Sequence, residues 1–238
     1  GMRTCEGAAR CATDVRSAVA HCGACGVRCR GVGARCTGGR CDAVRALAAG
    51  VGHACVLRDT GVLACWGSNA ARELGTPTTG DRAVPELVQT VADASGLVLG
   101  AGSTCVLRGA QPALCWGRCD PTDVLGCSVA REPQVFDGAA YAGARAGASG
   151  TMHSCAVFDP GVVRCWGKNG GGQLGNGTTR ESTTPVVVAG VEGAAEVAVG
   201  NAFSCARVAA GTVSCWGHNA YGQLALPTSM PVRTLATP

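Results

Sequence analysis

The chain has 238 residues, of which 47% are hydrophobic, 4% aromatic and 15% charged, and its formal net charge at pH 7 is +4. This length is enough for one or two domains with a sizeable core. The positive charge is spread thinly, without a basic run, so the sequence predicts no nucleic-acid partner. No stretch approaches about 18 uninterrupted apolar residues, so it also predicts no membrane span.

Cysteine content is the strongest compositional signal, with 17 cysteines in the chain. Thiols at this density are a liability in a reducing cytosol, whereas disulfide-rich chains are typical of oxidising compartments. We therefore expect an extracellular, periplasmic or cell-surface location. The chain opens at Gly1 and Met2 without the basic and apolar regions of a signal peptide, so this expectation requires a leader outside the given sequence.

Residues 1–42 are predicted to form a small cysteine-rich segment stapled by disulfides. A segment of this size buries too little apolar surface to fold without cross-links. Cys22 and Cys25 form a Cys-x-x-Cys pair, which leaves a zinc site or a redox pair as alternatives. Neither a second spaced pair nor a strand–helix context supports them. Cys5 is left over from an even set of six; the seven cysteines are Cys5, Cys11, Cys22, Cys25, Cys29, Cys36 and Cys41.

One phrase is repeated four times across residues 43–238, which we predict to be a second domain. The stretch HACVLRDTGVLACWG, residues 53–67, returns at 103–117, 153–167 and 203–217, so the period is 50 residues without drift. A period of this size indicates an array or a propeller. The four units lie at about 43–92, 93–142, 143–192 and 193–238.

Each unit is predicted to contain four short strands. In the third unit the runs SCAVFD and VVRCW flank Asp159, Pro160 and Gly161, which favour a tight turn between two strands. An extended run begun by proline, TPVVVAG, and an apolar run, AAEVAVG, supply the other two strands. Helix periodicity is absent. Four strands in about 50 residues is typical of a propeller blade.

The hairpin register predicts one disulfide in each unit. If Arg58 and Val62 close the first turn, Cys55 lies directly opposite Cys65. Opposed residues in an antiparallel pair have Cα atoms about 4.5–5.5 Å apart, and a disulfide needs about 4.4–6.8 Å. The predicted bridges are Cys55–Cys65, Cys105–Cys115, Cys155–Cys165 and Cys205–Cys215.

The alternative is that these paired thiols bind a metal or react. A hairpin pair without a nearby His or a second Cys pair is two ligands short of a zinc site. Carboxylates do not recur in register, and no nucleophile or phosphate-loop motif is present. We therefore expect structural disulfides and no catalytic, cofactor or metal site.

Two further repeat positions are predicted to serve packing. His53 and His153 share a position that holds Ser103 and Phe203 in the other units. A catalytic residue would not be duplicated and then replaced by phenylalanine, so we expect a packed site with some hydrogen bonding. The four tryptophans all lie in the Cys-Trp-Gly phrases and are expected to pack between units.

The third unit, read as His-x-Cys-x5-Gly-x3-Cys-Trp-Gly-x-Asn-x2-Gly-Gln-Leu-Gly, resembles the regulator-of-chromosome-condensation repeat. The resemblance covers about residues 44–238 and implies an all-β fold, a β-propeller, which in that family has seven blades. It implies the bacterial, disulfide-bearing type, similar to secreted β-lactamase-inhibitor propellers. The residues that carry it are Trp166-Gly167, Asn169, Gly172 to Gly175 and Pro185, with Trp66-Gly67, Asn69, Leu74-Gly75, Pro85, Trp216-Gly217, Asn219 and Gly222 to Leu224 in the first and fourth units.

The second unit departs from this pattern in one loop. The stretch GRCDPTDVLGC contains two additional cysteines, Cys119 and Cys127, which are predicted to bridge it. Rigid scaffolds present variable loops for recognition, so the loop is a candidate recognition site through Arg118, Asp120 and Asp123. A drifted loop stapled only for stability is the alternative.

Four units are fewer than the seven of a closed ring in that family. A fragment, a closed four-unit molecule and a symmetric assembly of chains all stay open. An incomplete ring has open strand edges, so self-association through these edges is expected.

These observations favour a secreted or surface-associated protein-binding scaffold without catalytic activity, whose partner is an unidentified extracellular protein. Two alternatives remain. The first is a guanine-nucleotide exchange or chromatin-type regulator like the eukaryotic namesake, against which the disulfide spacing and thin charge argue. The second is a cell-wall-directed enzyme or an enzyme inhibitor, for which fold alone supplies no site.

Overall fold

A computed structural model describes residues 2–4, 12–14, 36–37, 40–88, 91, 93–118, 136–208 and 211–237. Two short antiparallel pairs lie in the cysteine-rich segment, β1 (Met2–Thr4) with β2 (Ala12–Asp14) and β3 (Cys36–Thr37) with β4 (Arg40–Cys41). Cys36 and Cys41 are both disulfide-bonded. The other five cysteines of this segment lie outside the described residues, and the boundary at residue 42 stays a prediction.

The rest of the chain forms four antiparallel sheets of four strands, each in simple chain order. This confirms the all-β prediction of four-stranded repeats, and a single 3-10 turn, Ala139–Tyr141, accompanies the strands of the described residues. The sheets are β5 (Val44–Ala49), β6 (His53–Arg58), β7 (Leu63–Gly67) and β8 (Arg82–Leu87); β9 (Gly96–Leu99), β10 (Ser103–Arg108), β11 (Gln111–Gly117) and β12 (Phe136–Gly138); β13 (Ala144–Ser149), β14 (His153–Phe158), β15 (Val162–Gly167) and β16 (Ser182–Val187); and β17 (Ala194–Val199), β18 (Phe203–Val208), β19 (Val213–His218) and β20 (Val232–Thr237).

The central hairpins have the predicted register. Arg58 N donates to the Val62 carbonyl at 2.9 Å, and Cys55 lies opposite Cys65. Gly61 closes the turn with a φ of 78°, a conformation that glycine adopts without steric cost. The same pairing recurs in the other three units, with a register shift near Arg108 in the second.

The outer strand of the third unit begins earlier than the sequence predicts. The sequence favours a strand begun by Pro185, but β16 begins at Ser182 and Pro185 is its fourth residue. Proline lacks the N–H that an internal ladder needs, so it is tolerated on edge strands. β16 is the edge strand of its sheet and pairs with β15 only at Ser182, Val186 and Val187.

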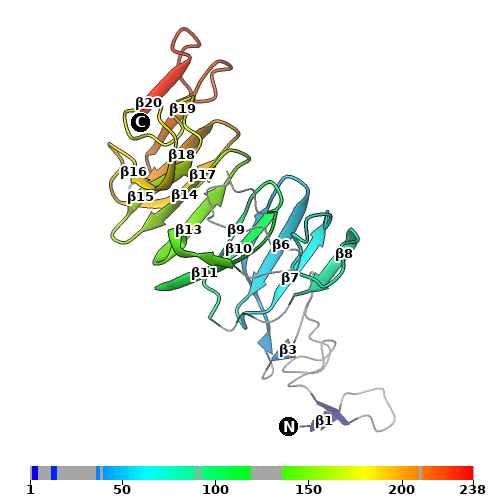
Figure 1. Ribbon diagram of the computed structural model, residues 1–238. Coiled ribbons are helices and arrows are strands. Elements are labelled where there is room, and N and C mark those ends of the chain that lie inside the picture. The colour runs from blue at the N-terminus through cyan, green and yellow to red at the C-terminus, as the bar shows by residue number, and fades with distance from the viewer. Residues whose placement is uncertain are drawn as a thin grey trace.

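Each sheet packs face to face against the next one in the chain. Three buried apolar clusters occupy the three junctions between consecutive units. The inner strands β5, β9, β13 and β17 contact one another in sequence. Figure 1 shows the four sheets following one another in a row, with the sheet of β8 near one end and that of β20 at the other. The molecule is an arc of propeller blades rather than a closed ring.

Candidate functional site

The four hairpin disulfides lie within the four blades, and three of them line the junctions between units. All four are formed, with Cα–Cα distances of 4.0–4.1 Å, slightly closer than the expected spacing. In the first three units the cysteines are at most 2% exposed. Each of these bridges packs in one cluster with the tryptophan of the following unit: Trp116, Trp166 and Trp216. They are structural cross-links in an apolar core, and the expected inter-unit packing of tryptophan is confirmed.

A hydrogen-bonded chain crosses the junction between the first and second units. His53 Nε2 lies 2.8 Å from Thr104 Oγ1, and Thr104 Oγ1 donates to the Glu73 carbonyl at 2.7 Å. Trp116 Nε1 donates to the same carbonyl at 3.0 Å. Because the single hydroxyl proton is used on the carbonyl, the imidazole must carry its hydrogen on Nε2. The first unit therefore supplies the imidazole and the carbonyl, and the second supplies the hydroxyl and the indole.

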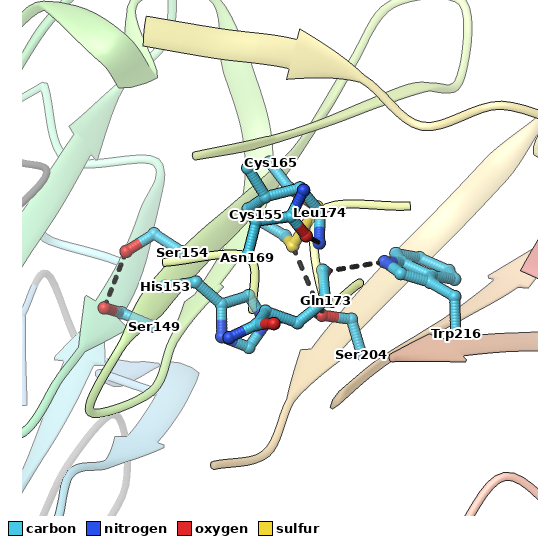
Figure 2. Close-up of a disulfide and its surroundings, with 10 residues drawn as sticks. All are labelled: Ser149, His153, Ser154, Cys155, Cys165, Asn169, Gln173, Leu174, Ser204 and Trp216. Carbon is cyan, nitrogen blue, oxygen red and sulfur yellow. Dashed lines mark hydrogen bonds between the residues drawn. A yellow bond between two sulfur atoms is a disulfide. The ribbon is translucent and has the colours of Figure 1, made fainter. Parts of the chain in front are cut away.

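The same chain recurs between the third and fourth units. His153 Nε2 lies 2.6 Å from Ser204 Oγ, which donates to the Gln173 carbonyl at 3.3 Å, and Trp216 Nε1 donates to that carbonyl at 2.8 Å. Figure 2 shows these side chains beside the Cys155–Cys165 bridge. Burial lowers the pKa of His153 to about 4. These histidines are neutral packing residues with a hydrogen bond across the junction, as the repeat pattern predicts.

The repeated asparagine fixes the loop after each Cys-Trp-Gly phrase. Asn69, Asn169 and Asn219 are at most 1% exposed, and the side-chain oxygen of each accepts the N–H of the leucine five residues later at 2.9–3.0 Å. Their amide nitrogens donate to loop carbonyls 7–11 residues onward. The second unit has Cys119 at this position. Residues 119–135 lie outside the described residues, so the predicted Cys119–Cys127 bridge stays a prediction.

Four glycines, one in each unit, bring the inner-strand ends together around the axis of the arc. These are Gly50, Gly100, Gly150 and Gly200, and the N–H of each donates to the carbonyl three residues later at 2.8–2.9 Å. A Cβ on Gly50 would lie 2.4 Å from the Gly100 carbonyl oxygen, and one on Gly150 would lie 2.5 Å from that of Gly200. The turns therefore approach one another as closely as bare backbone allows. A hollow of about 320 Å³ lies between them, lined also by Val51, Ser149, Thr151 and Asn201.

The residues around this hollow vary from unit to unit, although the glycines do not. We call the set the axial surface: the turn tips Val51, Ala101, Thr151 and Asn201, with Ser68, Arg118, Lys168 and His218. All four tips are exposed. The other four members of the set, from Ser68 to His218, each follow a Cys-Trp-Gly phrase. They lie beside the tips because their backbone N–H groups donate to the carbonyls of residues 52, 102, 152 and 202 at 2.6–2.9 Å. The axial surface thus combines a constant frame with different side chains in each unit.

The structure places one residue of the predicted recognition loop at the axial surface. Arg118 is exposed and follows β11 beside the second turn. Asp120 and Asp123 lie outside the described residues. The turn tips carry no motif of their own, and turn chemistry alone is enough to explain the constant glycines beside them. A comparison of residues 51, 101, 151 and 201 across the period does reveal four different side chains at one repeat position.

The described residues contain no group of three or more His, Cys, Asp or Glu side chains that could hold a metal ion. In the same part of the chain no helix is long and apolar enough to cross a membrane. Several carboxylates instead pair with arginines on the surface. A hydrogen bond from Arg108 lowers the pKa of Asp93, and one from Arg207 lowers the pKa of Glu196. Such paired, exposed acids are typical of solvated strand surfaces.

The repeat phrase has a counterpart among known proteins. Residues 161–207 match the regulator of chromosome condensation (RCC1) repeat, and residues 44–71 and 194–223 match a second form of it. The chain contains RCC1 repeats. A stretch of 60 residues is 43% identical to the E3 ubiquitin-protein ligase HERC2 of Homo sapiens and Mus musculus. This stretch is 25% of this chain and 1% of HERC2.

Solved structures with a similar fold share the architecture. Human WBSCR16 superimposes with a TM-score of 0.63 at 20% identity, over 82% of this chain and 54% of that one. Prp20p from Saccharomyces cerevisiae gives a TM-score of 0.59 at 18% identity, over 80% of this chain and 49% of that one. This chain thus spans about half the length of these solved chains. The likeness shows an RCC1-like propeller fold.

Proposed function

We propose that the chain is a secreted or surface-associated protein-binding scaffold without catalytic activity of its own, and that the axial surface holds the partner. The observation that carries this proposal is the contrast between constant and variable positions around the hollow. Gly50 and its equivalents fix the turns, whereas the exposed tips are Val, Ala, Thr and Asn. A rigid frame that presents varied side chains beside a concavity is a common design for recognition.

An oxidising location supports the same proposal. Ten described cysteines in the repeat units and at the end of the cysteine-rich segment are disulfide-bonded, and six of them are nearly inaccessible at the junctions. Disulfides of this density persist outside the cytosol. The partner is therefore expected to be an extracellular, periplasmic or surface protein. Prp20p, whose structure is described with its binding to Gsp1p and histones, shares the fold alone at 18% identity.

The expected partner contact has a small protruding side chain in the hollow. A volume of about 320 Å³ is at the lower end of ligand pockets, so it suits a side chain better than a cofactor. Its lining combines exposed Val51 with the hydroxyl of Thr151 and the amide of Asn201. We expect the variable loop that starts at Arg118 to extend this contact, with Asp120 and Asp123 as further recognition residues.

Capture of the partner by the immobilised, oxidised protein tests the proposal. Secreted and envelope proteins of the producing organism serve as the source. Val51→Arg and Thr151→Arg should each abolish capture, because an arginine at a turn tip blocks the hollow. Ala110→Arg is the matched control, since this exposed turn residue follows β10 at the end opposite the axial turns. Capture that survives both tip variants would place the binding site elsewhere.

The location is tested separately by alkylating free thiols in the protein as it is made in its native organism. We expect Cys55, Cys65 and their equivalents to be unlabelled without reductant and labelled after denaturation with it. Labelling of eight or more cysteines in the unreduced protein would contradict an oxidising location, whatever the outcome of the capture experiment.

A further inference from the structure

We propose that the partner protein places the carboxylate of an aspartate or glutamate side chain in the hollow of the axial surface, where Arg118 pairs with it. This inference rests on the proposed function, because it assigns the chemistry of the side chain that the hollow holds. Three features of the described residues support it. Hydrogen-bond donors are left free at the turns, the nearby carboxylates are already bonded, and the charge of Arg118 is not paired.

The backbone of the four axial turns has free donors. The second residue of each turn uses its carbonyl to accept the N–H of the residue after a Cys-Trp-Gly phrase, at 2.6–2.9 Å. These second residues are Gly52, Gly102, Met152 and Ala202. Their own N–H groups, and those of the tips before them, have no acceptor among the described residues. Unpaired backbone N–H groups favour an anion, because a carboxylate accepts hydrogen bonds and donates none.

The side chains that line the hollow add a further donor. Thr151 Oγ1 donates to Asn201 Oδ1, so the hydroxyl proton and the amide oxygen are both used within this pair. The amide nitrogen of Asn201 has no acceptor in the described part of the chain and stays free to donate. Ser149 Oγ lies 2.8 Å from Ser154 Oγ, so these two hydroxyls bind each other. The hollow therefore presents an amide donor beside the free N–H groups of the turns.

The acids near the axial surface are bonded within the chain. Three carboxylates lie in the described parts of the loops that follow the Cys-Trp-Gly phrases. Glu73 accepts a serine hydroxyl and a backbone N–H, each at 2.7 Å, and Asp81 accepts the N–H of Asn69 at 3.0 Å. Glu181 lies 2.7 Å from Nζ of Lys168 and neutralises that lysine. The unpaired charge of these described loops is therefore positive and comes from arginine.

Arg118 supplies this charge beside the hollow. It is exposed, and no ion pair of the described residues includes it. A Cβ added to Gly102 would lie 3.2 Å from Arg118 Cβ and 3.8 Å from its Cδ, so the side chain extends over the second turn. Gly100 of the same turn lines the hollow. A guanidinium at this place favours a carboxylate, with which it forms paired, charge-assisted hydrogen bonds.

The frame of the hollow favours a side chain over the end of a chain. Its turns are in backbone contact, since a Cβ on Gly50 would lie 2.4 Å from the Gly100 carbonyl oxygen. A C-terminal carboxylate would bring its own backbone between these turns, whereas a side chain reaches in from a partner that stays outside. The net charge of +4 also favours an acidic partner surface.

Three small probes that differ only in their carboxylates test the proposal. N-acetylglutamic acid α-amide has the side-chain carboxylate, N-acetylglutamine has the α-carboxylate, and N-acetylglutamine amide has neither. In NMR titrations of the oxidised full chain, we expect the first probe to shift the backbone amide signals of Thr151 and Asn201. The second should bind roughly tenfold more weakly, and the third should cause no shift. Equal binding of the first and third probes, preference for the second, or no binding of the first on the order of 50 mM would each overturn the proposal.

Two variants test the residues that hold the carboxylate. Arg118→Gln removes the charge and should weaken binding of the first probe roughly tenfold. Asn201→Asp keeps the shape but replaces the free donor by a charged acceptor, and it should abolish binding. Arg207→Gln and Asn176→Asp are the matched controls, because Arg207 lies near the far end of β18 and Asn176 lies beside the outer strand β20. Unchanged melting verifies folding, and equal losses in a variant and its control would reduce the effect to general charge attraction and overturn the proposal.

Capture of the partner separates this inference from the proposed function. If the tip variants abolish capture but Arg118→Gln and Asn201→Asp do not, the axial surface holds a partner without a carboxylate, and this inference alone fails. If capture survives the tip variants, the proposed binding surface itself fails. Loss of capture in Arg118→Gln and Asn201→Asp, with capture kept in Arg207→Gln and Asn176→Asp, is the result expected.

Discussion

The two buried imidazoles make the stability of the arc depend on pH. His153 is 2% exposed, its Nδ1 has no hydrogen-bond partner among the described residues, and burial lowers its pKa from the ordinary 6.5 to about 4. Burial also lowers the pKa of His53, partly opposed by the nearby Glu73 carboxylate. At His153 the unfolded chain therefore binds a proton below about pH 6.5 that the folded chain does not bind until about pH 4. Stability is fully present above pH 6.5 and falls as the pH drops through this window.

For His153 alone the loss between pH 7 and pH 5 is expected to be about 2 kcal/mol. Urea unfolding at the two pH values measures it. His153→Gln is the matched variant, because its amide N–H can donate to Ser204 as Nε2 does but cannot titrate. It should be less stable at pH 7 and lose less on acidification. An equal loss in wild type and variant would show that the imidazole is not the titrating group.

A second residue-scale prediction concerns the glycines at the axis. In Gly150→Ala the new methyl group would lie 2.5 Å from the Gly200 carbonyl oxygen, which is backbone and cannot rotate away. We expect a loss of about 2–4 kcal/mol in the free energy of unfolding. Gly170→Ala is the control, since a Cβ added there would have no atom of the described residues within 4 Å, and it should be nearly neutral. Equal melting temperatures for both variants would contradict the close approach of the turns.

At the scale of the elements, the four hairpin disulfides close loops of the same length but differ in what covers them. Each bridge joins residues 10 apart, so the constraint on the unfolded chain is the same, nominally about 2–3 kcal/mol. Replacing Cys155 and Cys165 by alanine also opens a cavity under Trp216, which adds a packing loss. The same double replacement at Cys205 and Cys215 removes a partly exposed bridge. The third-unit variant should therefore unfold at lower denaturant concentration than the fourth-unit variant, and the reverse order would contradict the burial of the bridges in the junctions.

The hairpins were predictable because their determinants are local. A turn residue fixes the register, and the register fixes which cysteines oppose each other, as Cys55 and Cys65 show. The junction chain was not predictable in this way, since His53 and Thr104 are 51 residues apart and belong to different units. The predicted start of β16 was wrong, because an edge strand tolerates Pro185 in its middle. The axial surface was not predictable either, because it depends on turns of all four units meeting at one end.

At the scale of the whole molecule, the arc has one partly exposed tryptophan and three buried ones. Each interior junction buries the indole of the following unit, whereas Trp66 lies on the face of the first unit that points away from the second and is partly exposed. Acrylamide should therefore quench about a quarter of the fluorescence of the dilute protein, assuming similar yields, and Trp66→Phe should remove this fraction. Trp66→Phe tests whether the quenched fluorescence comes from this one indole, and it leaves the interior junctions undisturbed. Quenching of all four tryptophans alike would show that the junctions are open in solution.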